Sequence, residues 1–276
     1  MRWRKCIDKT GKPRYKWMKS NSHLWLLAGT SILVVIAAML LPPVAQPAEY
    51  HHFADRRSLL GIPNFNDVIS NLAFLLSGSA GLVFLRQVHR SPTQTAFQDR
   101  KESWPYWVLF LSIASVAFGS IHYHWAPDID HLLWDRLPIV IAIAALLSAT
   151  LVERLSRTAG LWALPLLVVL AVLSVLYWYW TEQQGAGNLN FYIVMQFYSI
   201  LLIVWISLRF PSRYTHGNGI YQIIALYAVA KVFEMLDAQI FAWTNGWISG
   251  HTLKHLIAAF AAYGIVRILR RRGVVK

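Results

Sequence analysis

Long apolar segments set the limits on what this chain can fold into. Eight of them recur along its 276 residues, each close to the roughly 20 residues that cross a bilayer core as a helix. They cover residues 22–41, 67–86, 104–124, 132–152, 160–180, 189–208, 219–243 and 248–269. Only 14% of the residues are charged, whereas a soluble domain carries roughly a quarter. Because a spanning segment must satisfy its own backbone hydrogen bonds, we predict an all-α, polytopic membrane protein.

The basic residues are distributed unevenly along this pattern. The formal net charge is +13, but the positive charge concentrates in residues 1–21, in alternate connections and in the tail 270–276, which argues against nucleic acid as a partner. By the positive-inside rule both termini are cytoplasmic and residues 42–66 form an outer loop. We expect a multi-pass protein of a bacterial inner membrane whose basic ends bind anionic lipid headgroups. Segment 22–41 could also be a signal sequence, but its long basic start and weak cleavage pattern favour a retained helix.

Five polar residues that this topology places near the outer face come from three distant segments. Ser120 and His124 end the third segment, Asp135 starts the fourth, and His251 and His255 lie in the outer half of the eighth. Because residues four apart share one helix face, His251 and His255 can bind one ion, and His124 can supply a third imidazole. Three imidazoles with an open fourth position are typical of a catalytic Zn²⁺ site, in which the pKa of bound water falls to about 7.

Each of these residues also has a structural interpretation that the sequence leaves open. A histidine near a helix end is often an interfacial hydrogen-bonding residue, and a serine within a span often bonds to its own helix. Asp135 equally fits the first turn of a helix, where a carboxylate favours the helix dipole, or an ion pair with Arg136. The convergence of five such residues at one membrane depth is what favours a site.

The order of these residues resembles the alkaline ceramidases, part of the superfamily that also holds the progestin and adiponectin receptors. A serine is followed after three residues by a histidine, after ten more by an aspartate shortly before Leu-Pro, and finally by the paired histidines of the last helix. The segment "GIPNFNDVISNLAFLL" (61–76) is similar to the start of that family's first core helix, and the resemblance extends over residues 55–263. It implies a ceramidase-like seven-helix core at 67–269, which makes 22–41 an extra N-terminal helix.

The same resemblance implies the roles of the polar residues. It makes His124, His251 and His255 the Zn²⁺ ligands, Asp135 the proton carrier, and Ser120 a neighbour that steadies the developing oxyanion. The implied activity is that of a zinc-dependent membrane hydrolase, cleaving an amide in a ceramide-like lipid at a site toward the outer side. Two other functions stay open: a receptor-like relative with a structural zinc site, and a proton-coupled transporter, for which the sequence lacks inverted repeats. No oligomeric state is defined.

One stretch departs from the family pattern. Eukaryotic ceramidases carry an acidic, calcium-binding segment before the first core helix, and this chain has "HHFADRRSLLGIPNFND" (51–67) instead. Asp55, Asn64, Asn66 and Asp67 offer some oxygen ligands, but Ca²⁺ prefers six to eight oxygens with several carboxylates. The sequence therefore does not favour a calcium site.

A second polar group lies in the seventh segment. Lys231, Glu234 and Asp237 recur three residues apart, which predicts one stripe along a helix. Charged residues within a membrane are costly and functional by default. We expect either a Lys231–Glu234 ion pair used in packing or a role in lining a substrate cavity.

Overall fold

A computed structural model describes residues 3–7, 13–17, 22–91 and 96–275 of the chain. The chain forms two compact units, Met1–Leu40 and Leu41–Lys276. In the first unit, β1 (Trp3–Ile7) and β2 (Pro13–Trp17) pair as an antiparallel hairpin. This hairpin lies in the basic segment 1–21, for which we predict no helix, and the all-α prediction holds for the helices that follow it. Basic and aromatic residues alternate along β2, a period of two that indicates a strand and that the long apolar segments overshadow.

Helix α1 (Ser22–Leu40) completes the first unit and covers the predicted segment 22–41. Its sequence is mostly apolar, with no acidic residue in the first turn and no basic residue in the last. The described apolar stretch, Leu24–Leu40, is shorter than the long helices of the second unit. That α1 crosses the membrane as an extra helix remains a prediction.

The second unit is built from helices, and within its described residues six of them are long and apolar enough to cross a membrane. These six contain 20 to 27 residues each, and a 20-residue helix spans about 30 Å, the thickness of a bilayer core. The chain therefore has the helices of a multi-pass membrane protein, and a bent helix pair gives a seventh candidate span. The elements are η1 (Ala48–His51), α2 (Phe65–Ser70), α3 (Leu72–Arg90), η2 (Arg100–Ser103), α4 (Trp104–Trp125), α5 (Ile129–Arg154), α6 (Arg157–Gln183), α7 (Asn190–Ile193), the π-helical turn η3 (Val194–Tyr198), α8 (Ser199–Arg209), α9 (Gly219–Met235), α10 (Asp237–Trp243) and α11 (Gly250–Arg271).

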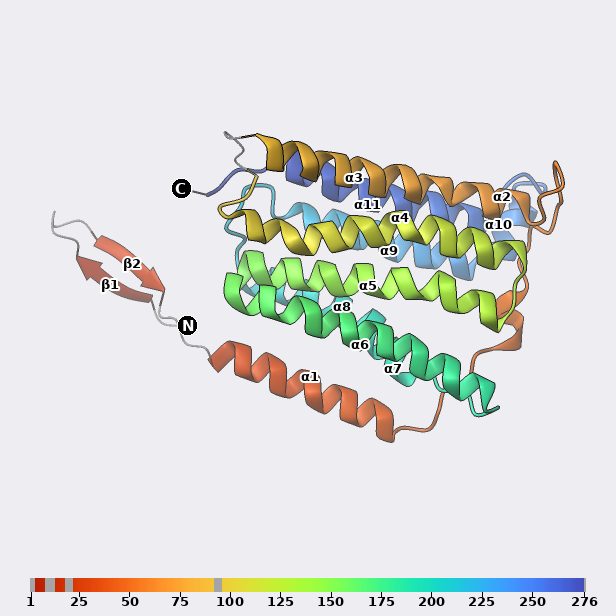
Figure 1. Ribbon diagram of the computed structural model, residues 1–276, viewed down its shortest axis with the longest axis horizontal. Helices are drawn as coiled ribbons and strands as arrows, with labels where there is room; N and C mark the ends of the chain where they lie inside the picture. The colour runs from red at the N-terminus through yellow and green to blue at the C-terminus, as the bar shows by residue number, and fades with distance from the viewer. Residues whose placement is uncertain (1–2, 8–12, 18–21, 92–95, 276) are drawn as a thin grey trace. The chain divides into compact units, whose positions relative to one another are not determined.

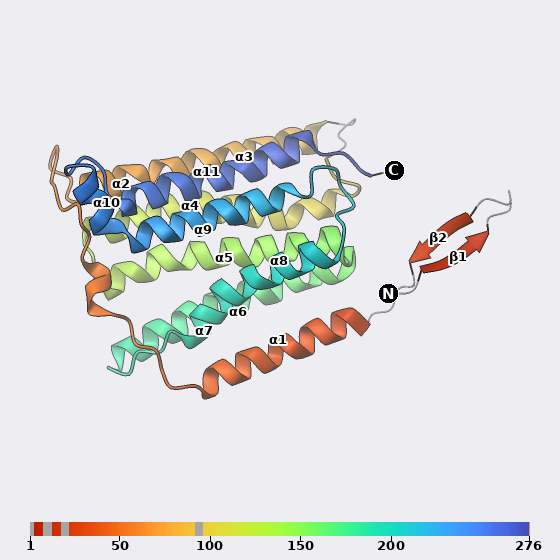
Figure 2. The same ribbon diagram turned by 180° about the vertical axis from the view of Figure 1, so that it is seen from behind.

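The helices of this unit lie alongside one another in two rows. Helices α3, α4, α5 and α6 follow one another in chain order (Figure 1), and α11, α9 and α8 form the row behind them (Figure 2). The last helix, α11, packs against both α3 and α9, which closes the bundle beside its first helix. This topology brings the end of α4, the start of α5 and the start of α11 to the same end of the unit.

Two of the basic residues at the opposite end are structural. Arg154 is buried and donates to the carbonyl oxygens of Phe210 and Gly217, both at 2.7 Å. Arg272 is only 5% exposed and donates to the carbonyl oxygen of Ala96 at 2.7 Å. The guanidinium of Arg272 is therefore used inside the fold, and binding of anionic lipid headgroups by the basic ends stays a prediction.

Candidate metal centre

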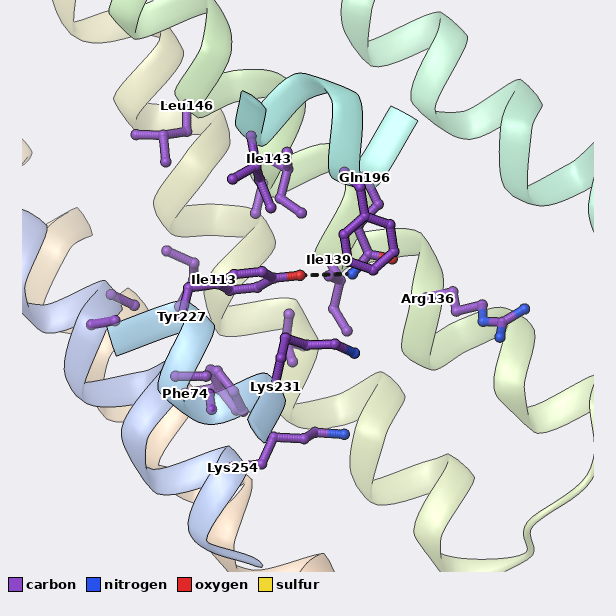
Figure 3. Close-up of a pocket in the computed structure, with 18 of the residues that line it drawn as sticks. Phe74, Ile113, Arg136, Ile139, Ile143, Leu146, Gln196, Tyr227, Lys231 and Lys254 are labelled. Atoms are coloured by element: carbon purple, nitrogen blue, oxygen red, sulfur yellow. Dashed lines mark hydrogen bonds between the residues drawn. The ribbon is translucent and has the colours of Figure 1, made fainter. Parts of the chain in front are cut away.

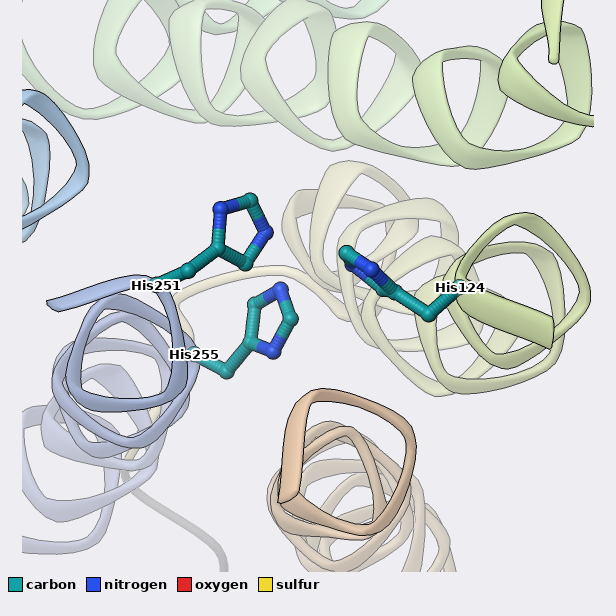
Figure 4. A group of neighbouring side chains, drawn as sticks. All are labelled: His124, His251 and His255. Carbon is teal, nitrogen blue, oxygen red and sulfur yellow. The ribbon is translucent and has the colours of Figure 1, made fainter. Parts of the chain in front are cut away.

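Three histidines from two helices meet in the interior of the second unit. His124 lies in the last turn of α4, while His251 and His255 lie one turn apart at the start of α11. All three side chains are buried, and one ring nitrogen from each lies within 4.8 Å of the others. Figure 4 shows the three rings converging on one point. The predicted convergence of these residues is confirmed, and the group could hold a metal ion.

The surroundings of two of the three rings, those of His255 and His124, fit a metal centre. The Nδ1 atom of His255 lies 2.8 Å from the Ser70 hydroxyl, which orients the ring and leaves its other nitrogen for an ion. The Nδ1 atom of His124 is buried and has no hydrogen-bond partner within the described residues. A buried nitrogen without a partner is costly, and a bound metal ion would satisfy it. The residues present therefore fit a metal ion with three imidazole ligands.

Short polar residues at the start of α2 position the ligands, and the sequence reasoning missed them. Asn64 donates its side-chain N–H to the His124 carbonyl oxygen at 2.8 Å, which fixes the end of α4. Asp67 is fully buried and accepts a hydrogen bond from the Thr252 hydroxyl at 2.6 Å, which fixes the start of α11. Together with Ser70, these residues place one short helix between both ligand-bearing helices.

Asp237 has a different role from the one predicted. The seventh span breaks between α9 and α10, which meet at an angle of 78°, so Asp237 does not continue a stripe with Lys231 and Glu234. Its carboxylate accepts the backbone N–H of His251 at 2.7 Å and that of Ala54 at 2.9 Å. The helix break lets one carboxylate join the loop that precedes α2 to His251, one of the three clustered histidines.

The loop that precedes α2 covers the three histidines with an aromatic ring. Phe53 is 5% exposed, and the centre of its ring lies 4.5 Å from that of His124 and 4.8 Å from that of His251. The Ala54 bond to Asp237 holds the adjoining backbone in place. Phe53 thus shields the histidines on the side of this loop.

Ser120 and Asp135 lie next to each other where α4 and α5 approach closely. Ser120 is a side-chain hydrogen-bond partner of Asp135, and both are buried. A Cβ atom on Gly119 would collide with the carbonyl oxygen of Trp134, so this contact requires glycine. Pro138 has no N–H to donate to that carbonyl four residues earlier, which explains why the oxygen is open to α4. The Leu-Pro step after Asp135 therefore helps to bring Ser120 beside it.

A cavity of about 350 Å³ opens beside this group. His255, Ser120 and Asp135 contribute to its wall, and most of the remaining lining is aliphatic or aromatic, including Ile143 and Leu146 (Figure 3). His124 and His251 are not part of the lining, so the cavity reaches the histidine group through His255. A polar end next to the three histidines thus continues into an apolar interior.

Charged residues of α9 and α11 also line this cavity. Lys231 pairs with Glu234, and Lys254 pairs with the same carboxylate at 2.8 Å. Both interpretations of the Lys231–Glu234 pair therefore hold, since the residues form an ion pair and line the cavity. Lys254 lies in the turn between the two histidine ligands, 3.1 Å from Nε2 of His251. The sequence reasoning assigned it no role.

Two of the four residues considered for calcium, Asp55 and Asn66, are hydrogen-bonded to each other. Asp55 is buried and forms two hydrogen bonds with the Arg57 guanidinium, at 2.6 and 2.8 Å, while Asn66 donates to it at 2.9 Å. Burial alone would raise the pKa of Asp55, but the hydrogen bonds from Arg57 outweigh it and hold that pKa below its ordinary value. The oxygens of Asp55 are therefore occupied by protein donors.

No protein family profile and no curated protein sequence matches this chain. Its function has to be inferred from the residues of the site itself.

Proposed function

We propose that this protein is a zinc-dependent integral membrane hydrolase that cleaves an amide bond in a lipid, ceramide-like in general form. One observation carries the proposal: a single cavity meets His255, Ser120 and Asp135 at one end and is apolar over most of its remaining wall. A lipid amide has the same division, with one polar amide and a long apolar chain. The resemblance to the alkaline ceramidases implies the same activity from the order of these residues.

His124, His251 and His255 would bind the zinc ion. When bound, zinc supplies Lewis-acid polarisation of a carbonyl and makes water a stronger nucleophile near neutral pH. Asp135 accepts a proton from the attacking water and passes it to the leaving amine. The Ser120 hydroxyl, beside Asp135, donates to the amide oxygen as negative charge develops there. Phe53 keeps bulk water away on the side of the outer loop.

We also infer the orientation in the membrane. The histidine group lies at the end of the unit opposite to Arg90, Arg154 and Arg271, which terminate α3, α5 and α11. Positive residues favour the cytoplasmic side, so the site faces the outer side of a bacterial inner membrane and both termini are cytoplasmic. Substrate then reaches the cavity from the lipid of that membrane.

Replacement of Asp135 by asparagine tests the enzyme against a receptor-like protein with a structural metal. Asp135→Asn keeps the shape of the side chain but cannot carry the proton, so release of fatty acid from a lipid amide should fall about 10²- to 10⁴-fold. Zinc content and melting temperature should change little, because Asp135 is not a ligand. The comparison measures all three quantities for wild type and variant.

Two results would count against the proposal. An unchanged rate in a folded, zinc-loaded Asp135→Asn variant would remove this residue from the mechanism. A wild-type protein that binds zinc but hydrolyses none of a panel of lipid amides would favour the receptor-like alternative.

A further inference from the structure

Two ammonium groups at the polar end of the cavity share one carboxylate. Lys231 and Lys254 both line the cavity, and each pairs with Glu234, one on each carboxylate oxygen. Glu234 can neutralise only one of them, and within the described residues neither lysine forms an ion pair with Asp135, the other carboxylate of the lining. An uncompensated charge at membrane depth is costly unless it finds a partner. The excess charge of the lysine pair favours an anionic group as the ligand of this cavity.

The two lysines are arranged to share such a group. They come from neighbouring helices, α9 and α11, and extend in the same direction into the cavity (Figure 3). Each ammonium has three N–H donors, and Glu234 accepts from one donor on each. Lys254 makes a further bond to His251. Donors on both lysines therefore remain for a ligand.

Arg136 does not take part in this arrangement. Its guanidinium lies over the rings of Trp178 at 4.1 Å and Tyr192 at 4.8 Å, and it donates to the side chain of Gln46. Its head group points away from the two lysines in Figure 3. Arg136 adds positive charge to the surroundings, but the lysine pair faces the cavity.

We propose that Lys231 and Lys254 form an anion subsite beside the metal centre, and that the natural lipid amide carries a carboxylate close to its amide, as an N-acyl amino acid does. The carboxylate has to be close to the amide because of Lys254. Its ammonium lies 3.1 Å from Nε2 of His251, and Lys254 directly precedes His255 in the sequence. An anion held there lies only a few bonds from an amide at the histidines. The identity of the substrate as an amide rests on the proposed function, whereas anion binding does not.

Two matched ligands test the subsite, N-myristoylglycine and N-myristoylethanolamine, which differ by a carboxylate in place of a hydroxymethyl group. Their affinities are measured on metal-free protein in nanodiscs, by competition with radiolabelled N-myristoylglycine, and their hydrolysis is measured on zinc-loaded protein. A hydrogen-bonded ion pair should make the carboxylate ligand bind about 10- to 100-fold more tightly. Equal affinities for the two ligands would overturn the subsite.

Variants of Lys231 locate the preference. Lys231→Met leaves Glu234 paired with Lys254 and removes the excess charge, so the preference for the carboxylate should fall by about tenfold or more. Lys231→Arg keeps the charge and should retain it. Lys101→Met, at an exposed lysine outside the cavity, is the matched control and should also retain it. A folded Lys231→Met variant with the wild-type preference would overturn the assignment.

The two proposals fail in different ways. If the carboxylate ligand binds preferentially but neither compound is hydrolysed, the anion subsite stands and the hydrolase is wrong. If both compounds are hydrolysed and bind equally well, the hydrolase stands and the subsite is wrong.

Discussion

The hydrogen bond between Ser70 and His255 allows a sharp test of the metal centre. Both side chains are buried, at 7% and 2% exposure, and the hydroxyl lies 2.8 Å from Nδ1 of the ring. Loss of an outer hydrogen bond to a ligand histidine typically lowers metal affinity about 10- to 100-fold, or roughly 1.4 to 2.8 kcal/mol. Ser70→Ala should therefore weaken zinc binding by that factor, since the ring loses the group that orients it.

The chain offers a matched control in Ser77. This serine is also 7% exposed, and its hydroxyl donates at 2.8 Å to the carbonyl oxygen of Ala259, so it joins α3 to α11 without touching a ligand. Ser77→Ala and Ser70→Ala each remove one buried hydrogen bond, which costs about 0.5 to 1.5 kcal/mol of stability. The two variants should lower the melting temperature similarly, but only Ser70→Ala should change zinc affinity.

The assay is competition between purified, metal-stripped protein and a chromophoric zinc chelator, with melting temperatures measured on the same samples. Ser70→Thr keeps the hydroxyl and should recover most of the affinity. Equal weakening in Ser77→Ala would show that the effect of Ser70→Ala is general destabilisation. A wild type that fails to compete with the chelator would remove the metal centre itself.

Two further predictions address packing and orientation. Gly119→Ala should force α4 and α5 apart, which should cost about 1 to 3 kcal/mol of stability and should also lower the rate of hydrolysis. Gly273→Ala should change neither quantity, because its added Cβ meets open space. Thermal unfolding and activity measurements on both variants test this. In a Cys6→Ser background, a cysteine at Glu49 should react with a membrane-impermeant maleimide on intact cells and one at Arg90 only after permeabilisation; the reverse pattern would overturn the proposed orientation.

The sequence identifies the helices and the three clustered histidines because their signals are local. Apolar length alone places the long helices of the second unit to within a few residues. The spacing of His251 and His255 fixes their common face, and the topology brings His124 to the same end. These inferences need only the 3.6-residue period of the α-helix and the fact that successive spans run in opposite directions.

The residues that position the ligands give no comparable signal. The bond from Ser70 reaches a residue 185 positions away, and the bond from Asp67 to Thr252 spans the same separation. The sequence shows a run of short polar residues at the start of an apolar helix. This run predicts that these residues have buried hydrogen-bond partners, but it does not identify those partners. The pairing depends on how α2 and α11 pack, which hydrophobic periodicity does not define.

The break at Asp237 shows a long-range requirement overriding a local pattern. The three-residue spacing predicts that Lys231, Glu234 and Asp237 lie along one face of a helix. In the structure the helix breaks before Asp237, whose carboxylate accepts hydrogen bonds from two backbone N–H groups. Those groups belong to Ala54, beside the ring of Phe53 that covers the histidines, and to His251 itself. One side chain therefore couples the cover of the site to the position of a ligand. Phe53 closes the loop side and an apolar cavity lies on the other, and both features support our proposal of a substrate that arrives through the bilayer.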